Sequence, residues 1–458
     1  MKDLTEGPVA KHVVQLAAFI AMSTAFQTLY FLADLYFVGR LGKEAIAGVG
    51  LAGNLMFLVL ALTQSLGVGT TSLIAQALGA KDKPRAERVF NQALALSTLT
   101  GIAFGIVVFA LRGGYARWLA ADAATAAAGL AYLDWFIPAL FLQFPMIAMG
   151  AALRGMGDMK IPTLIQVVTV VLNIVLAPTL MFGWITGRPL GVAGTAIASL
   201  IAVGFGCVAF TAYFRRPEGA IRFHVKDWTP DLALWGQILK IGLPAGGEFA
   251  LMTVYMVLVY SVIRPFGAAA QAGFGIGIRL VQSLFLPVVA IAFATAPVVG
   301  QNYGARLGER VREAYYTAAG MSAAVMLVLI ALCHISPAAM VRIFNSDPGV
   351  VAVGSEYLRI ISWNFLASGL VFVSSSVFQG IGNTLPSLAS SCLRLLLFAL
   401  PTFVMAQRPG FELKQVWYLS VAAVAIQLVV NLLLLHRELD KRLPATIPAT
   451  VQPIASES

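Results

Sequence analysis

Long apolar stretches follow one another along almost the whole chain, separated by short polar breaks. A helix of about twenty residues crosses the roughly 30 Å hydrocarbon core of a bilayer. The pattern therefore predicts an all-α integral membrane protein with twelve transmembrane helices. The predicted spans are residues 13–38, 47–78, 90–112, 127–150, 162–184, 191–214, 236–263, 270–303, 314–334, 352–377, 385–406 and 415–436.

The second half of the chain repeats the first at a fixed offset of 225 residues. Corresponding positions include Gln76 and Gln301, Tyr132 and Tyr357, and Gly155 and Gly380. Each half holds six predicted spans, and a six-span unit returns the chain to the side on which it began. We therefore expect two pseudo-symmetric six-helix bundles, related by an axis along the membrane normal, with a substrate cavity between them.

Polar segments between the halves and at the C-terminal end divide the chain into domains. We expect an N-terminal lobe (N lobe) at residues 1–215, a cytoplasmic linker at 216–235 and a C-terminal lobe (C lobe) at 236–440. The proline-containing end, residues 441–458, is predicted to be disordered.

The basic residues indicate an orientation. The formal net charge is +10, but the Lys and Arg residues lie beside the spans and not in a soluble basic domain, so we expect no nucleic-acid partner. They are more frequent in the breaks that follow even-numbered spans, which places both termini in the cytoplasm. The N-terminus lacks the pattern of a cleavable signal peptide. We expect a monomer that crosses the bacterial inner membrane many times, with the lipid bilayer as its surroundings.

Motifs for enzymatic chemistry are absent from the sequence. It holds no nucleotide-binding P-loop and no GxSxG, so neither ATP-driven transport nor a serine hydrolase is expected. Its four histidines and three cysteines lack metal-ligand spacing. We therefore expect no enzyme, no metal site and no cofactor other than a coupling ion.

Few ionisable residues lie within the predicted spans, and Asp34 is one of them. A carboxylate in a low-dielectric lobe is costly to keep charged, so it favours uptake of H⁺ or Na⁺. Asp34 is therefore a candidate coupling-ion site; the alternative is a carboxylate near a helix end, wetted from the periplasm. Its repeat equivalent is Val259, so the acid is specific to one lobe.

Glu248 follows Pro244 by one turn in the seventh span, next to two glycines that leave room for a ligand or a packed helix. It is a candidate for binding substrate or a proton, or else a structurally paired acid. Tyr255 on the same span is a candidate wall of a substrate site, or part of the core. Arg279 is a candidate counter-charge to an acid, or a snorkelling side chain.

Two further polar residues lie in the first lobe. Asn173 in the fifth span has an amide oxygen suited to a cation, and equally to a hydrogen bond between helices. Ser199 in the sixth span has the same two interpretations.

Several segments together resemble the multidrug and toxic compound extrusion (MATE) family of secondary transporters, over the chain up to about residue 440. They are LADLYFVGRLGKEAIAGVGLA, SLIAQALGAKD, GAALRGMGDMKIPT, NIVLAPTLMFGW, GVAGTAIASL, APVVGQNYGAR and SSVFQGIGNTLPS. The resemblance implies two six-helix bundles arranged as a V, which export organic cations in exchange for Na⁺ or H⁺.

The resemblance also implies roles for single residues. Asp34 matches the acid of the family's first helix, which is implicated in cation coupling. Asn173 matches the asparagine of the fifth-helix motif, and Ser199 matches the sixth-helix hydroxyl of one branch. The family's seventh-helix acid falls here on Met252, one turn beyond Glu248.

The leading hypothesis is a secondary active antiporter that exports drugs or organic cations by alternating access. One alternative is a flippase or metabolite exporter of the same superfamily. An alternative from another class is a membrane receptor or scaffold that does not transport.

Overall fold

The computed structural model describes residues 2–120, 122–184, 187–216 and 221–443. Within this part, eleven helices are long and apolar enough to cross a membrane, and the bent pair α11 and α12 makes a twelfth if it counts as one span. The elements are α1 (Val9–Gly39), α2 (Lys43–Gly79), α3 (Lys83–Leu119), α4 (Ala123–Gly155), α5 (Lys160–Met181), α6 (Val192–Phe214), η1 (Val225–Trp228), α7 (Leu232–Ile263), η2 (Arg264–Phe266), α8 (Ala268–Gly304), α9 (Gly308–Ile335), α10 (Pro337–Arg342), α11 (Pro348–Ile361), α12 (Asn364–Gly380), α13 (Leu385–Ala406) and α14 (Leu413–Arg442). The predicted all-α membrane fold is confirmed.

The tenth predicted span, 352–377, differs most from expectation. It is not one helix, because the chain bends by 55° between α11 and α12. Near the bend the Ser362 hydroxyl donates to the carbonyl of Arg359, a local hydrogen bond that competes with regular helix geometry. Helix α7 begins at Leu232, four residues before the predicted seventh span, with Asp231 as its N-cap.

The predicted disordered end, 441–458, needs a similar correction. Helix α14 continues to Arg442, so the first two residues of that range are helical. Residues 444–458 lie outside the described residues.

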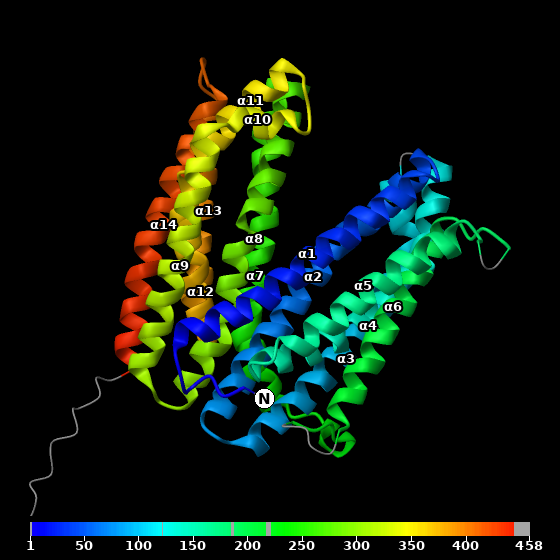
Figure 1. Ribbon diagram of the computed structural model, residues 1–458. Coiled ribbons are helices and arrows are strands. Elements are labelled where there is room, and N and C mark those ends of the chain that lie inside the picture. The colour runs from blue at the N-terminus through cyan, green and yellow to red at the C-terminus, as the bar shows by residue number, and fades with distance from the viewer. Residues whose placement is uncertain (1, 121, 185–186, 217–220, 444–458) are drawn as a thin grey trace, which may run out of the picture.

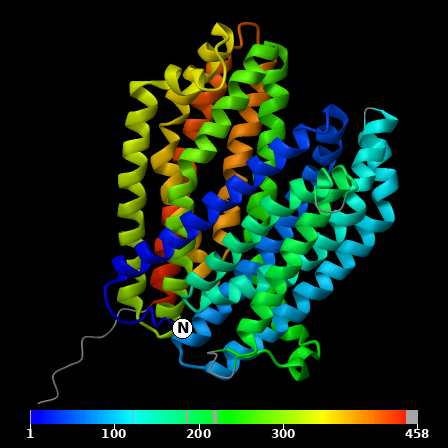
Figure 2. The same cartoon turned by 45° about the vertical axis from the view of Figure 1, so that its right-hand side comes forward.

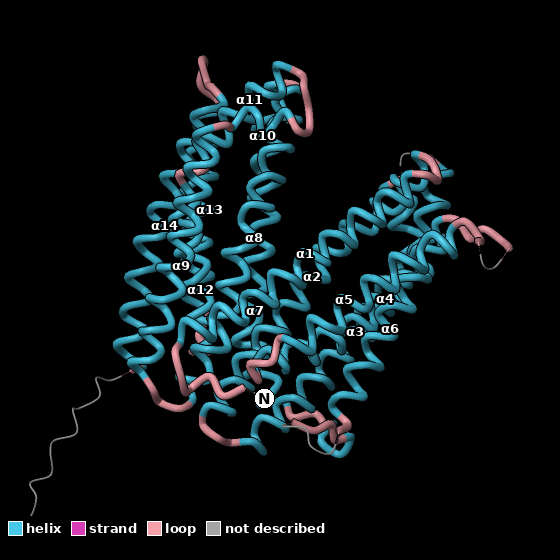
Figure 3. The backbone as a smooth tube through the Cα atoms, in the orientation of Figure 1, coloured by secondary structure: helices cyan, strands magenta, loops and turns pink. Residues whose placement is uncertain are grey.

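The helices form two bundles that meet at one end and diverge toward the other, like the arms of a V (Figure 1). Helices α1–α6 make the N lobe and α7–α14 the C lobe, and loops gather at the ends of the bundles (Figure 3). We call the end where the bundles meet the base, and the other the open end. The N-terminus and the end of α14 both lie at the base, the arrangement expected for an even number of spans (Figure 1).

The lobes contact each other reciprocally. Helix α1 packs on α8 of the other lobe, and α7 packs on α2, as an approximate two-fold axis requires. The lower part of α1 lies across the C lobe (Figure 2), where Val13 and Leu16 join its apolar core. The start of α7 correspondingly contributes Ile238 and Ile241 to the core of the N lobe. The lobes are thus interleaved at the base, and the division of the chain at residues 215 and 236 stays a prediction.

Two symmetric hydrogen bonds join the lobes at the base. Gln76 Nε2 donates to the Gly380 carbonyl over 2.8 Å, and its repeat equivalent Gln301 donates to the Gly155 carbonyl over 3.0 Å. Helices α2 and α8 approach so closely here that a Cβ on Gly79 would lie 1.9 Å from the Gln301 carbonyl oxygen. Glycine is required at this crossing because no other residue would fit.

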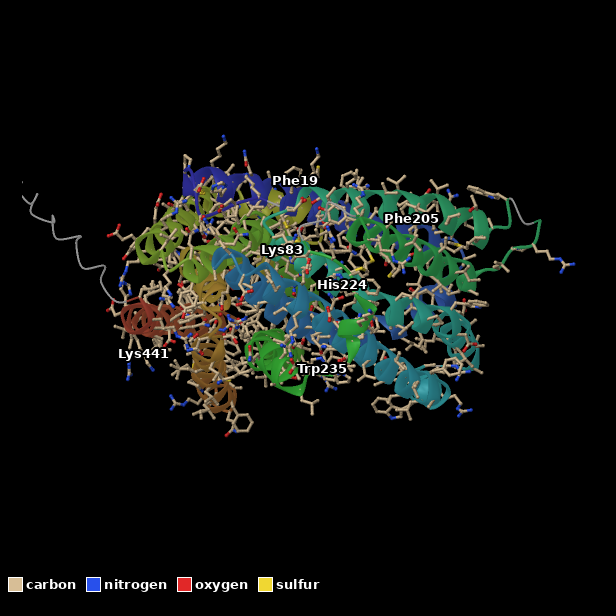
Figure 4. All side chains as sticks on the ribbon, turned by 90° about the horizontal axis from the view of Figure 1, so that it is seen from below. Phe19, Lys83, Phe205, His224, Trp235 and Lys441 are labelled. Atoms are coloured by element: carbon tan, nitrogen blue, oxygen red, sulfur yellow. The ribbon has the colours of Figure 1, made fainter. Side chains whose placement is uncertain are left out.

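The N-terminal segment crosses the base and contacts both lobes. Leu4 is completely buried; its N–H donates to Gln301 Oε1 over 2.9 Å, and its carbonyl accepts from Asn302 Nδ2 over 3.1 Å. On the N-lobe side, the Lys2 N–H donates to the Met156 carbonyl over 3.3 Å. Viewed from below, Lys83 at the start of α3 lies near the middle of the molecule, whereas Trp235 near the start of α7 lies toward its lower side in this view and Lys441 near its edge (Figure 4).

Candidate functional site

A hydrogen-bonded group in the N lobe contains two of the predicted ion-coupling residues. Asn173 Nδ2 on α5 donates to Ser199 Oγ on α6 over 3.1 Å, and both side chains are buried. Ser199 Oγ is also hydrogen-bonded to the Tyr30 hydroxyl of α1, again over 3.1 Å. Three helices therefore meet at one serine hydroxyl.

Asp34 lies one helical turn after Tyr30, on the same side of α1. Its side chain is half-buried, and Oδ1 is buried without a hydrogen-bond partner among the described residues. The carboxylate lies within electrostatic range of the hydroxyls of Tyr30 and Tyr132, and in the described part of the chain no basic side chain balances it. A carboxylate in this situation is costly to keep charged unless it binds a proton or a cation.

The C lobe holds a related group. The Tyr255 hydroxyl on α7 is hydrogen-bonded to Ser420 Oγ on α14 over 3.0 Å, and Asn364 Nδ2 approaches the same oxygen at 3.4 Å. The Tyr255 ring packs on Phe398, with ring centroids 4.8 Å apart. The guanidinium carbon of Arg394 lies 5.4 Å from the centroid of the Tyr255 ring.

Glu248 lies beside this group and has partners that Asp34 lacks. The Ser387 hydroxyl is within hydrogen-bonding range of the Glu248 carboxylate, and Arg394 acts on it electrostatically without forming a direct ion pair. Ser387 is in turn hydrogen-bonded to Ser375. The Nε of Arg394 is buried and lacks a hydrogen-bond partner in the described ranges. Glu248 thus has both a hydrogen-bond donor and a cation nearby, and its role as a binding acid stays a prediction.

Two other predicted residues take no part in these hydrogen-bonded groups. Met252 is 40% exposed on α7, so it does not replace the acid inside the lobe core. Arg279 is exposed on α8, and none of the described ion pairs includes it. The cation that acts on Glu248 is Arg394 of α13 and not Arg279.

Tyr30, Ser420 and Asn364 were not identified from the sequence. The repeat held a signal for the first of them, since Tyr30 and Tyr255 correspond at the 225-residue offset. The serines correspond at a shorter offset, because the loop between α13 and α14 is shorter than the loop between α5 and α6. Among the described residues no group of three His, Cys, Asp or Glu side chains is arranged to hold a metal ion.

Comparisons with known proteins agree with this architecture. A family model described as MatE matches residues 20–179 and 244–404. The probable multidrug resistance protein YoeA of Bacillus subtilis is 26% identical over 418 residues, which cover 90% of each chain. The multidrug export protein MepA of Staphylococcus haemolyticus is 25% identical over 386 residues, covering 82% of this chain and 83% of MepA.

A solved structure is also similar. An outward-facing multidrug resistance MATE family transporter of the MOP superfamily superposes with a TM-score of 0.88 at 26% identity, over 96% of this chain and 98% of that chain. The two matched ranges of the family model fall in the two halves of the repeat and together make up more than half of the sequence. The chain therefore belongs to the MATE family of membrane transporters and not to an enzyme family.

Proposed function

We propose that this protein is a secondary active antiporter that exports organic cations and other drugs in exchange for H⁺ or Na⁺. Its relatives YoeA and MepA carry the names of multidrug resistance and export proteins. The single observation that supports ion coupling best is the Asp34 carboxylate, with a buried oxygen that lacks a partner among the described residues. Uptake of H⁺ or Na⁺ there removes an uncompensated charge from the lobe.

The residues have separate roles in this proposal. Asp34 takes up the coupling ion, and Asn173 and Ser199 support the site from α5 and α6. Glu248 provides the negative charge for a cationic substrate, and Tyr255 provides an aromatic wall beside it. Met252 lies one turn after Glu248 on α7 and is exposed, so it extends this wall toward the space outside the lobe core.

Alternating access explains the closed base and the open end. With both termini in the cytoplasm, the bundles diverge toward the outside, so this is the outward-open form. The inward-open form then requires separation of the base, including the hydrogen bonds of Gln76 and Gln301 and the contacts of Leu4. We expect a monomer to be sufficient, because each chain carries both lobes.

Two alternatives remain to be tested against this proposal. A flippase or metabolite exporter of the same superfamily would transport an anionic or lipid-linked compound through the same space. A receptor or scaffold would move no compound, and vesicles containing the protein would not release dye faster than empty ones.

The test uses the full chain in proteoliposomes loaded with ethidium, a cationic dye. We expect dye efflux in response to either a pH step or a Na⁺ step. Whichever ion drives efflux in the wild type, Asp34→Asn is expected to abolish the response to it. The amide keeps the shape of the side chain but cannot carry the titrating charge.

Asp440→Asn serves as the matched control, because Asp440 is an exposed acid paired with Arg312 at the base. Its efflux should equal that of the wild type. Ion-driven efflux by Asp34→Asn at the wild-type rate would disprove the coupling role, provided that size-exclusion profiles show folded protein.

A further inference from the structure

A cavity of about 170 Å³ lies between the lobes, above the contacts of the base. Residues of α1, α2, α4, α8 and α12 line it, and Ser72, at its lower edge, precedes Gly79 by about two helical turns. Three pairs of lining residues are repeat equivalents at the 225-residue offset. They are Val68 and Phe293, Thr71 and Ala296, and Arg154 and Gln379. The cavity therefore lies on the pseudo-two-fold axis, where both lobes contribute equivalent positions.

Arg154 is the charged residue of this lining. It lies in the last turn of α4 and is half-buried. No hydrogen bond or ion pair within the described ranges involves its guanidinium, and its surroundings keep water away without providing a charged partner. A cation inside a helical membrane protein normally has an anionic or carbonyl partner. The α4 carboxyl-terminal dipole supplies only a partial negative charge.

The surroundings of Arg154 leave its fork of N–H donors accessible. Gly67 of α2 faces it, and a Cβ on this glycine would lie 3.3 Å from one of the terminal guanidinium nitrogens. A larger side chain at this position would therefore fill the space in front of the guanidinium. Absence of a side chain at Gly67 keeps a volume open directly beside the charge.

Other donors point to the same kind of ligand. Ser23, Gln64 and Gln379 also line the cavity, and their side chains form no hydrogen bonds with the described part of the chain. No Asp or Glu is among the lining residues. The cavity thus combines one cation with neutral donors and lacks a protein anion, a composition that favours an oxyanion.

The size of the cavity limits the ligand. Its volume corresponds to about five or six water molecules, and pockets that hold drug-sized ligands measure roughly 300–1,000 Å³. A carboxylate or phosphate group fits, whereas a whole drug molecule does not. This distinguishes the cavity from the substrate position proposed near Glu248.

We propose that this cavity binds an oxyanion group, a carboxylate or a phosphate, with Arg154 as its charged partner and Gln379 as a donor from the opposite lobe. The anion then bridges the N lobe and the C lobe on the symmetry axis. By neutralising Arg154 and linking the two lobes, it stabilises the form with the closed base. This site is separate from Asp34 and Glu248 and does not depend on the coupling ion.

The test is a titration of the purified, delipidated full-length protein with inorganic phosphate, against sodium chloride of equal ionic strength. Binding to the folded state raises the midpoint of thermal unfolding in a saturable way. We expect this rise in the wild type, and Arg154→Gln should weaken the apparent affinity at least about tenfold. Gln379→Met should weaken it less and provides a second variant if Arg154→Gln does not fold.

Arg117→Gln is the matched control, because it removes the same charge from an exposed position near the end of α3. It should keep the phosphate effect. Native mass spectrometry of protein that has not been delipidated distinguishes the sources: a phospholipid retained by the wild type and lost in Arg154→Gln identifies a headgroup as the ligand. A wild type with neither a saturable phosphate effect nor a retained phospholipid, or equal losses in Arg154→Gln and Arg117→Gln, would overturn the proposal.

Discussion

The two lobes share a tyrosine–serine hydrogen bond and differ in their acids. Tyr30 and Ser199 form the bond in the N lobe over 3.1 Å, and Tyr255 and Ser420 form it in the C lobe over 3.0 Å. The tyrosines are repeat equivalents, and the serines occupy corresponding positions once the shorter loop before α14 is taken into account. Because the bond occurs in both lobes, it belongs to the common framework and does not by itself indicate a function.

The acids have no such counterparts. Asp34 corresponds to Val259, Glu248 to Ser23, and Arg394 to Thr169. The N lobe thus holds an acid without a balancing cation in the described structure, and the C lobe holds an acid with Arg394 nearby. Comparison of the repeats separates the framework from the residues that make each lobe different, and the proposal of ion uptake in the N lobe rests on this difference.

The largest expected difference between the lobes is in coupled ion movement when each acid is replaced by its amide. We expect Asp34→Asn to lower ion movement coupled to dye efflux at least about tenfold, because it removes the unbalanced charge. Glu248→Gln should retain coupled ion movement, since Arg394 already offsets that carboxylate. Ion flux is measured in proteoliposomes with a pH-sensitive dye or with radioactive Na⁺, alongside efflux of a neutral substrate.

The opposite result would contradict this assignment of roles to the two lobes. If Glu248→Gln abolished coupled ion flux and Asp34→Asn preserved it, the C lobe would be the coupling lobe. Asp440→Asn again controls for the loss of one surface carboxylate.

The next effect concerns the base, where equivalent glutamines have unequal partners. Gln301→Leu leaves the Gly155 carbonyl and the buried Leu4 N–H without a partner. Gln76→Leu leaves the Gly380 carbonyl and the Ser72 hydroxyl without their donor, but a hydroxyl can rotate to suit another partner, whereas a backbone N–H cannot. An unsatisfied buried polar group costs about 1–3 kcal/mol, so Gln301→Leu should lower the thermal unfolding midpoint more than Gln76→Leu. Equal shifts would show that the N-terminal segment adds nothing to the closed base.

The fold could be predicted almost completely from the sequence, because it follows from the lengths and order of the apolar stretches along the chain. Apolar length fixes the spans, and the 225-residue repeat fixes the two bundles. The break between α11 and α12 was missed, since a bend of 55° leaves the apolar pattern of the span unchanged. The crossing of α1 onto the C lobe was also missed, because an apolar helix face does not specify which lobe it packs against.

The site could be predicted only in part. Asp34 and Glu248 stand out as rare acids in apolar surroundings, and the structure places Asn173 next to Ser199. Arg394 could not be chosen over Arg279 as the cation near Glu248, because both lie in apolar stretches and only the packing of α13 on α7 decides. Arg154 could not be singled out from the sequence, because it lies at the end of an apolar span, where basic residues are common in membrane proteins.

A smaller effect should appear in substrate affinity. Glu248→Gln leaves Arg394 uncompensated and should weaken binding of a cationic dye more than binding of a neutral one. Arg394→Gln should strengthen binding of the cation, each by a roughly fivefold change for a charge pair of about 1 kcal/mol. Affinities are measured by fluorescence anisotropy in detergent.

The opposite directions of the change in cation affinity in Glu248→Gln and Arg394→Gln test whether the charge of Glu248 binds the substrate. Lowering the pH neutralises the carboxylate in the wild type, so cation affinity should fall, and this dependence should vanish in Glu248→Gln. Equal loss for cationic and neutral compounds would instead assign Glu248 a structural role.

The smallest effect should come from the framework serines, and it tests whether Ser199 has a role of its own. Ser199→Ala and Ser420→Ala each remove an oxygen that binds one tyrosine and one asparagine. If both serines only support the framework, each variant should lose about 1 kcal/mol of stability and shift the unfolding midpoint by the same amount, with coupled ion flux unchanged. A loss of flux in Ser199→Ala without one in Ser420→Ala would instead show that Ser199 takes part in ion uptake beside Asp34. Thermal unfolding and ion flux measured on the same preparations distinguish these outcomes, because the shared hydrogen bond affects stability in both lobes and a coupling role affects flux in only one.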